Sequence, residues 1–217
     1  MSQKVTAHAR LADLPFLPEL RLYQAGPGVG LWSHSGGEYS SDSPPPFWAF
    51  AWAGGQGLAR YVLDHPDLVA GRRVLDLAAG SGLVAVAAAR AGAAAATAVD
   101  VDPDALDAAR LNAAANDVTI GVARLDLLDP DAHAAADAYD VVLAGDLFYT
   151  EAVAGRARAF LRRAARSGAL VLVGDARRGF LPERLFQEIA AYEVPVPPAI
   201  EESRLRRAMV YRLEVLN

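Results

Sequence analysis

An acidic residue and two aromatic residues follow an apolar run in the second half of the chain. The stretch "YDVVLAGDLFYT" (139–150) begins like a buried strand, and Asp146, Phe148 and Tyr149 come directly after the run ends. Asn, Asp, Ser or Gly can end a strand at little cost, so an acid followed by aromatic side chains needs a further reason. Carboxylates and phenols both take part in proton transfer, which makes this stretch a candidate reacting site.

A glycine-rich turn earlier in the chain has the spacing of a nucleotide-binding motif. In "DLAAGSGLVA", Gly80, Gly82 and Ala85 satisfy the pattern G-x-G-x-x-A and open a predicted helix. Asp100 ends the next predicted strand, where its carboxylate is placed to hold ribose hydroxyls. Taken alone, the pattern indicates a nucleotide-like cofactor and does not say which one.

Asp76, at the end of the strand before the glycines, distinguishes between two cofactor classes. A nicotinamide dinucleotide would bring its pyrophosphate to this helix N-terminus, where the Asp76 carboxylate would repel it. S-adenosylmethionine (SAM) has no phosphate and carries an ammonium group that an acid attracts. In dinucleotide folds the first glycine also follows the strand at once, whereas Leu77, Ala78 and Ala79 precede Gly80 here. The sequence therefore favours SAM.

A third acid follows the third predicted strand, in "RLDLL". Asp126 lies where a carboxylate could accept a hydrogen bond from an adenine amino group, with Leu125 and Leu127 as apolar walls. An isolated Asp at such a place is more often a helix cap or a turn former. Because Asp76 and Asp100 stand at the ends of the first two strands and Asp126 follows the third, we favour the adenine contact.

Short apolar runs rich in β-branched residues alternate with Ala-rich helical runs, and this rhythm must position the acids. Such alternation predicts right-handed βαβ units and a parallel sheet with helices on both faces. The predicted strands are 73–77, 96–101, 119–125, 140–145 and 169–174, and the predicted helices are 54–64, 82–92, 102–116 and 151–166.

The two ends of the chain depart from this rhythm. Residues 181–192 have a helical pattern, 193–198 an extended one, and 207–215 alternate like an antiparallel edge strand with one wet face. Residues 26–46 are rich in Gly, Ser and Pro, which predicts a loop or lid. We therefore predict one α/β domain over 47–217, a Rossmann-like, doubly wound, seven-stranded sheet, mostly parallel with an antiparallel C-terminal strand, preceded by an N-terminal segment over 1–46.

Composition excludes several classes of function. The chain has 217 residues, 53% of them hydrophobic, which suffices for one full-sized α/β core. Its net charge of −5 argues against a nucleic-acid partner. It has no cysteine, and its four histidines share no ligand spacing, so no metal site is expected. No signal peptide or membrane span is predicted, and a cytoplasmic protein, assumed monomeric, is the expectation.

Arginines cluster in the predicted helix 151–166. Their spacing fits the exposed face of that helix, so the sequence favours a solvated face over an anion-binding patch. The cluster consists of Arg156, Arg158, Arg162, Arg163 and Arg166.

The motifs together resemble a known family. "VLDLAAGSG" is similar to the glycine motif of class I, seven-strand methyltransferases that use SAM. More closely, "PPPFWAFAWAGGQGLARYVLDHP", "DLFY" and "GDARRGFLP" resemble the lysine methyltransferases that act on the β subunit of electron transfer flavoprotein. The resemblance covers roughly 44–215, and the aromatic block and "DLFY" are its most specific parts.

The resemblance implies a role for each matching residue. Trp52 would lie against the cofactor, and Gly145 would be a small residue beside it. Asp146 to Tyr149 would face the target lysine. The remaining matches are to cofactor-binding positions: Asp76, Ala78, Ala79, Gly80, Ser81 and Gly82 around the methionine moiety, Asp100 and Val101 at the ribose, and Asp126 and Leu127 at the adenine.

The implied reaction assigns functions to the three residues after the fourth strand. A lysine ammonium has a reference pKa of about 10.4 and must lose its proton before it attacks. Asp146 would orient the amine or accept its proton through water, Tyr149 would hydrogen-bond the nitrogen, and Phe148 would flank the alkyl stem or pack beneath the site. Asp175, after the fifth strand, would contact the incoming protein or simply form a turn. The general methyltransferase pattern has its first Gly where Ala78 stands, and we expect the methyl group of this alanine to hold φ below zero.

Three alternatives stay open at this point. A methyltransferase of the same fold could act on a ribosomal protein or a small amine. A nicotinamide-dependent oxidoreductase is disfavoured by Asp76. A non-catalytic module that only binds the cofactor is disfavoured by the intact "DLFY" element.

Overall fold

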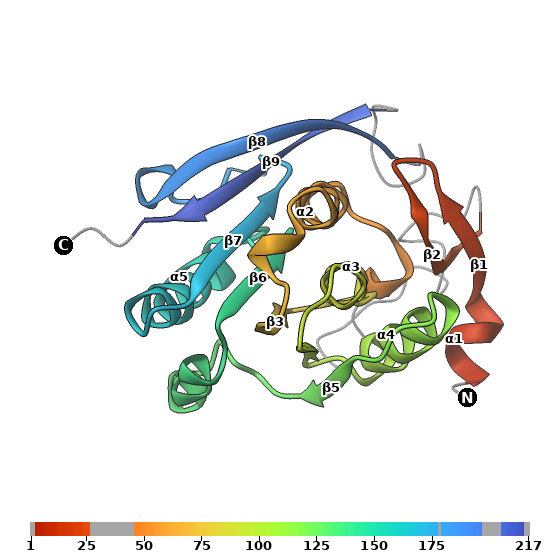
Figure 1. The fold of residues 1–217 in the computed structure, drawn as a ribbon, viewed down its shortest axis with the longest axis horizontal. Coiled ribbons are helices and arrows are strands. Elements are labelled where there is room, and N and C mark those ends of the chain that lie inside the picture. The colour runs from red at the N-terminus through yellow and green to blue at the C-terminus, as the bar shows by residue number, and fades with distance from the viewer. Residues whose placement is uncertain (1–2, 27–45, 178, 197–204, 215–217) are drawn as a thin grey trace.

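A seven-stranded sheet forms the middle of the molecule (Figure 1). The structure is a computed structural model that describes residues 3–26, 46–177, 179–196 and 205–214. The strand order is β5-β4-β3-β6-β7-β9-β8. The strands are β3 (Arg73–Leu77), β4 (Ala95–Asp100), β5 (Gly121–Arg124), β6 (Val141–Gly145), β7 (Leu170–Asp175), β8 (Phe186–Pro195) and β9 (Leu205–Leu213). β3 to β7 are parallel, and β9 pairs antiparallel with both β7 and β8, which confirms the predicted fold class.

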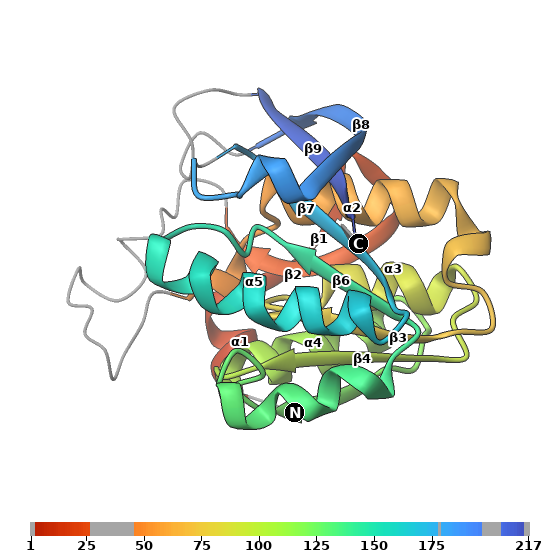
Figure 2. The same ribbon diagram turned by 90° about the vertical axis from the view of Figure 1, so that its left-hand side faces the viewer.

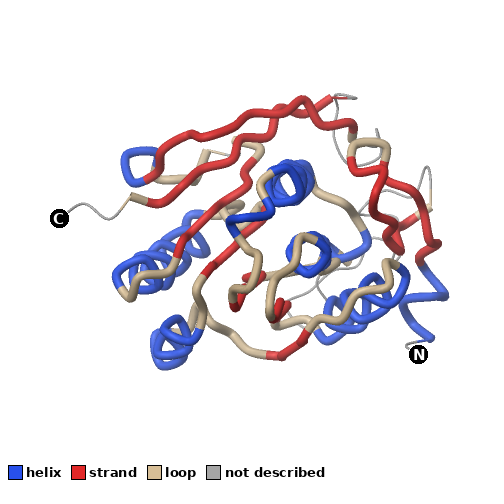
Figure 3. The backbone as a smooth tube through the Cα atoms, in the orientation of Figure 1, coloured by secondary structure: helices blue, strands red, loops and turns tan. Residues whose placement is uncertain are grey.

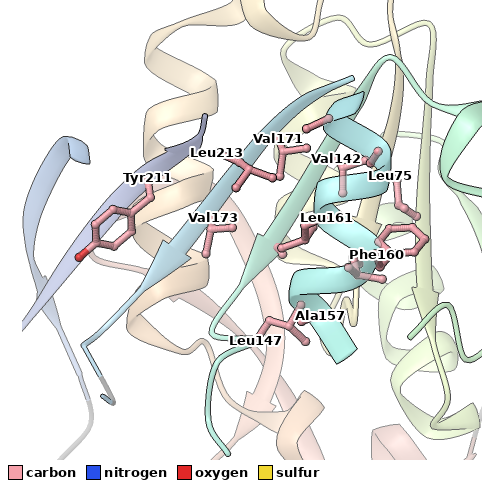
Figure 4. Packing of buried hydrophobic residues seen from close by; sticks show 14 of the residues in the cluster. Leu75, Val142, Leu147, Ala157, Phe160, Leu161, Val171, Val173, Tyr211 and Leu213 are labelled. Carbon is pink, nitrogen blue, oxygen red and sulfur yellow. The ribbon is translucent and has the colours of Figure 1, made fainter. Parts of the chain in front are cut away.

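Helices cover both faces of this sheet (Figures 1 and 2). One face packs against α2, α3 and α4, and the other against α5. Adjacent strand residues point to opposite faces, so Val141 and Leu172 pack on the first side, and Val142 and Val173 on the second. Figure 4 shows Phe160 of α5 in this second layer. The helices are α2 (Ala53–Asp64), α3 (Leu83–Arg90), α4 (Pro103–Ala115) and α5 (Glu151–Arg166), with short 3-10 segments η1 (Phe47–Ala49), η2 (Pro66–Leu68), η3 (Pro130–Ala138) and η4 (Glu183–Leu185).

Local sequence explains where α4 and α5 begin. At α4, the Asp102 side chain accepts a hydrogen bond from the Asp104 N–H, and Pro103 occupies the first turn. At α5, the Thr150 hydroxyl accepts from the Val153 N–H at 3.3 Å. The two caps end the loops that follow β4 and β6, so they help to fix the loops that carry the candidate acids.

The N-terminal residues form a helix and a hairpin that the sequence did not predict. These elements are α1 (Gln3–His8), β1 (Ala9–Leu14) and β2 (Leu17–Ala25). Asn112 of α4 and its C-cap residue Asn116 bind β2: the Tyr23 N–H donates to Asn112 Oδ1 at 2.7 Å and the Arg21 N–H to Asn116 Oδ1 at 2.9 Å. The predicted domain division at residue 46 stays a prediction, and most of the predicted loop or lid, 27–45, lies outside the described residues.

The C-terminal part differs from the sequence prediction in two respects (Figure 3). Residues 186–192 belong to β8, so the predicted helix 181–192 is wrong apart from the one turn of η4. The predicted strand 193–198 is, as far as it is described, the continuation of β8. β9 is antiparallel as predicted, but it lies between β7 and β8, so β8 forms the edge. Other parts of the core pack on both faces of β9, so its residues Ala208 to Tyr211 are all buried.

No helix in the described part of the chain is long and apolar enough to cross a membrane.

Candidate active site

A cavity of about 590 Å³ opens at the C-terminal ends of β3, β4 and β6. This is where ligands bind in open parallel sheets. We call it the main cavity. Its lining includes most of the residues singled out in the sequence: Trp52, Asp76, Ala78, Ala79, Gly80, Ser81, Asp100, Val101, Asp126, Leu127, Gly145, Asp146 and Tyr149.

Two of the singled-out residues do not line the main cavity. Gly82 allows α3 to pack on α4, because a Cβ at this residue would lie 2.6 Å from the Ala109 Cβ. Phe148 is completely buried in the core on the α5 side and meets Phe186 edge-on, with ring centroids 5.8 Å apart. Of the two places considered for Phe148, the structure shows the one beneath the site.

The backbone of Ala78 is left-handed, with φ of 54°. The expectation that its methyl group would hold φ below zero is therefore wrong. The chain must turn from β3 into the glycine loop here, and the loop is held at its far side by a hydrogen bond from the Gly80 N–H to Asp100 Oδ2 at 2.9 Å. Tertiary geometry has overridden the local preference of alanine.

Replacing Ala78 by Gly should raise the stability of the protein. A left-handed alanine carries a steric penalty that glycine lacks, and the greater freedom of glycine in the unfolded chain offsets part of it. We expect a net gain of about 0.5–1 kcal/mol in the free energy of unfolding. Urea denaturation of the two proteins measures it, and a loss of stability would contradict the assigned backbone conformation.

Asp76 is a buried acid at the end of β3. Asp76 is only 1% exposed. Its Oδ2 accepts a hydrogen bond from the Ala85 N–H in α3 at 2.9 Å. Burial raises the pKa of Asp76 to about 8; the hydrogen bond from Ala85 opposes this shift and the charge of Asp100 adds to it. A cationic group in the main cavity would favour the ionised form.

The raised pKa of Asp76 predicts that the difference in stability between the wild-type protein and the Asp76→Asn variant depends on pH. The folded protein binds this proton more tightly than the unfolded chain, in which the pKa is near 3.8. The wild-type free energy of unfolding should therefore fall, relative to the variant, as pH rises from about 4 to about 8, and then level off. Melting temperatures of both proteins without cofactor, measured from pH 5 to 9, test this. A difference that does not change with pH would contradict it.

Asp100, at the end of β4, ties two loops together. Its Oδ2 accepts from the Gly80 N–H at 2.9 Å and its Oδ1 from the Asp102 N–H at 3.0 Å. An ionised carboxylate has about four acceptor sites, so both oxygens can still accept hydroxyl hydrogen bonds from the main cavity. The neighbouring Val101 is 56% exposed at the rim.

Asp126 forms an ion pair that the sequence did not reveal. Its Oδ2 accepts from Arg156 Nη2 of α5, and its Oδ1 accepts from the Leu128 N–H at 3.0 Å. Arg156 also lines the main cavity, while Leu127 is buried in its wall. An adenine contact by Asp126 stays a prediction, and the ion pair holds its carboxylate in place.

Asp146 is fixed by backbone groups from two neighbouring elements. Its own N–H donates to the Gly174 carbonyl of β7 at 2.8 Å, and its Oδ2 accepts from the Gly55 N–H of α2 at 2.7 Å. Its φ of 51° is left-handed, a conformation that Asp tolerates better than most residues. These contacts hold the half-buried carboxylate at the main cavity.

Aromatic side chains gather on one side of the main cavity. Phe47 lies 6.2 Å from Trp52 and 6.3 Å from Tyr149 between ring centroids, and the Trp52 Nε1–H donates to the Phe47 carbonyl at 2.9 Å. Phe47 and Tyr149 are 45% and 49% exposed. The sequence reasoning did not single out Phe47, although the aromatic block "FWAFAW" held the signal.

Taken together, the main cavity combines carboxylates with aromatic walls. Burial is the main reason that the pKa of Tyr149 is raised, and the charge of Asp100 adds to it, so its phenol is neutral at pH 7. Among the described residues, no group of three His, Cys, Asp or Glu side chains could hold a metal ion. The arrangement can bind a cation, stack an alkyl chain against rings, and orient or deprotonate an amine.

Comparisons with known proteins point to methyltransferases. Residues 61–171 match the family model described as ribosomal protein L11 methyltransferase (PrmA). Over 216 residues the chain is 32% identical to the electron transfer flavoprotein beta subunit lysine methyltransferase of Xenopus laevis, covering 97% of this chain and 85% of that protein. The protein of the same name from Danio rerio is 34% identical over 175 residues, covering 78% of this chain and 66% of that relative, slightly under two thirds.

Solved structures show the same fold. A Streptococcus mutans protein assigned as a SAM-dependent methyltransferase has a TM-score of 0.53 at 17% identity, covering 75% of this chain and 50% of that chain. TrmN from Thermus thermophilus has a TM-score of 0.50 at 25% identity, covering 72% of this chain and 48% of TrmN. The first likeness shows the fold alone.

Proposed function

The chain belongs to the family of electron transfer flavoprotein β-subunit lysine methyltransferases, and from this premise we propose that it transfers a methyl group from SAM to a lysine of that subunit. One observation carries the proposal: Asp146 and Tyr149 lie in the same cavity as the glycine loop and its acids. A cofactor and a lysine chain can therefore meet there.

The main cavity fits SAM better than a dinucleotide. Asp76 and Asp100 line it beside the glycine loop, and an ammonium or sulfonium group would be attracted where a pyrophosphate would be repelled. Among the described lining residues, Arg156 is the one arginine or lysine, and it is paired with Asp126. We assign Asp76 to the ammonium, Asp100 to the ribose, and Asp126 with Leu127 to the adenine.

When bound, SAM supplies an electrophilic methyl group on a sulfonium. The protein's part is to deliver a neutral amine in line with it, so most of the acceleration comes from positioning. The rings of Phe47 and Tyr149 shield the alkyl stem of the lysine from water, which disfavours its charged form. The Asp146 carboxylate, held by the Gly55 N–H, orients the amine or takes its proton through water, and the neutral Tyr149 hydroxyl hydrogen-bonds the nitrogen.

Replacing Asp100 by Ala should weaken cofactor binding. The variant loses the carboxylate that would accept ribose hydroxyls and the two hydrogen bonds that shape the glycine loop. A hydrogen bond to a charged group contributes about 1.5–3 kcal/mol, so the dissociation constant should rise by at least about tenfold. Titration calorimetry measures this, with Asp107→Ala on the surface of α4 as the control. Equal affinity in both variants would argue against the ribose assignment.

The acceptor is tested by direct comparison. The purified protein is incubated with methyl-labelled SAM and either electron transfer flavoprotein β subunit or ribosomal protein L11, the second because residues 61–171 match the L11 methyltransferase model. We expect label in the flavoprotein subunit. Label in L11 alone would reassign the substrate while keeping the reaction class.

A further inference from the structure

A second hollow, of about 700 Å³, lies at the same end of the sheet on the α5 side. Its walls come from α5, from the segment after β7, and from β9. Four arginines line it, Arg158 and Arg162 of α5 and Arg177 and Arg184 of the segment after β7. We call it the arginine pocket.

Register places the arginine pocket beside the main cavity. Gly145 of β6 pairs with Gly174 of β7, so Asp146, directly after β6, and Asp175, the last residue of β7, lie at the ends of adjacent strands. Asp146 lines the main cavity and Asp175 lines the arginine pocket. Helix α5 starts directly after Thr150, and at 1.5 Å per residue Arg158 lies about 12 Å further along its axis. A folded protein can span both sites, whereas a small amine cannot.

The charges of α5 are divided between its sides. Arg156 and Arg163 are paired with Asp126 and Asp137. Arg158 and Arg162 are exposed and form no ion pair with any other described residue. All five arginines of the cluster are exposed, as the sequence predicted, and Arg158 and Arg162 in addition line the arginine pocket.

The rest of the arginine pocket leaves a positive excess. Arg177 pairs with Glu188 at 3.5 Å. Asp175, the one acid among the described lining residues, is 1% exposed and its Oδ1 accepts from the Arg177 N–H at 2.6 Å. This turn is one of the two roles considered for Asp175. In a chain of net charge −5, such a local excess favours anionic groups.

Tyr211 of β9 supplies an independent indication of a ligand. The residue is 3% exposed and lines the arginine pocket, and its hydroxyl has no hydrogen-bond partner among the described residues. Figure 4 shows this hydroxyl pointing away from the labelled Val173 and Leu213 side chains. Buried hydroxyls are normally paired, and a ligand oxygen would satisfy this one.

We propose that the arginine pocket binds a carboxylate side chain of the protein acceptor and so docks an acidic surface patch beside the target lysine. The proposal rests on the proposed function in taking a protein as the substrate. Arginine pairs carboxylates with two parallel hydrogen bonds, and the Tyr211 hydroxyl adds a third donor. Because this contact is remote from the methyl group, it should act on acceptor binding and leave the chemical step unchanged.

The first test measures carboxylate binding without catalysis. A fluorescein-labelled hexaglutamate peptide is titrated with the full chain at low ionic strength, and anisotropy is recorded. Arg158→Glu and Arg162→Glu should each weaken binding by about tenfold or more, whereas Arg166→Glu, on the same helix outside the pocket, should not. Arg158→Gln serves as a milder variant, and melting temperatures check folding. Equal binding by all of these proteins would overturn the proposal.

Tyr211→Phe separates a ligand contact from a structural role. The variant removes the unpaired hydroxyl, so its melting temperature should stay equal or rise, while peptide affinity falls. Unchanged peptide affinity would remove Tyr211 from the site. Inorganic phosphate is then added as a competitor. If phosphate displaces the peptide and the arginine variants leave acceptor kinetics unchanged, the pocket binds free anions, and the docking role is overturned.

The second test uses methylation of electron transfer flavoprotein β subunit. Arg158→Glu should raise KM for the subunit by about tenfold and leave kcat and SAM affinity unchanged, with Arg166→Glu behaving like wild type. An unchanged KM, with the subunit methylated, would overturn the pocket and keep the proposed function. If wild type does not methylate the subunit and Arg158→Glu still weakens peptide binding, the acceptor is wrong and the carboxylate site stands.

Discussion

Asp146→Asn is expected to lose most of its methyl transfer while keeping its fold and cofactor affinity. The Asn side chain keeps an oxygen that can accept from the Gly55 N–H, and Asn tolerates the left-handed backbone at this position. It cannot take up a proton from the lysine ammonium. Loss of a positioned general base typically lowers turnover by about 10²–10⁴-fold.

Single-turnover methylation of the acceptor measures this loss, and calorimetry with SAM checks the cofactor site. Asp117→Asn is the matched control, because Asp117 is also left-handed, with φ of 55°, but does not line the main cavity. Turnover by Asp146→Asn within about threefold of wild type would contradict the role given to this carboxylate.

Gly54→Ala is expected to damage both stability and activity. A Cβ at Gly54 would lie 2.6 Å from the Gly174 carbonyl oxygen and 2.7 Å from Asp146 Oδ2. Neither contact is possible, so α2 must move away from β6 and β7 or the Asp146 carboxylate must turn. Overpacking of this kind costs about 1–3 kcal/mol, and displacement of Asp146 should lower turnover as well.

Gly55→Ala is the control for stability. Its Cβ would approach no atom closer than 3.9 Å, and alanine favours helix over glycine, so its melting temperature should equal or exceed that of wild type. Thermal unfolding of the two variants side by side gives the comparison. Similar melting temperatures would show that α2 is not tightly seated against the strand ends that carry Asp146.

The parallel part of the fold could be predicted because its sequence signals are local. Most strands from β3 to β7 are short apolar runs, and the helical segments after β4, β5 and β6 each begin with a side-chain cap. The acids after these strands could be placed in one site because parallel strands end at the same edge. Asp76, Asp100 and Asp146 line one cavity for this reason.

The errors arose where tertiary contacts outweigh local preference. Residues 186–192 contain Gln, Glu and Ala, which favour helix, yet they pair with β9. A register shift between Glu188 and Ala190 also interrupts the alternation that signals a strand. Ala78 adopts a left-handed conformation because the turn between β3 and the glycine loop is fixed by its surroundings. No local sequence pattern predicts this conformation.

Long-range pairs account for what was missed in the site. Asp126 and Arg156 are 30 residues apart and meet only because α5 returns over the sheet. Phe47 joins Tyr149 across an even longer separation. Phe148 and Tyr149 are neighbours in sequence, but the backbone turns one side chain into the core and leaves the other at the cavity. The sequence indicates which residue types belong to the site, but it does not show which of them meet in the folded protein.

Intact-mass analysis of electron transfer flavoprotein β subunit tests the central claim most directly. The subunit is incubated with SAM and either the wild-type protein or Asp146→Asn. We predict that the wild-type protein adds the mass of one or more methyl groups, that peptide mapping places them on lysine, and that the variant adds little in the same time. An unmodified subunit, from a wild-type protein shown by calorimetry to bind SAM, would contradict the proposed substrate.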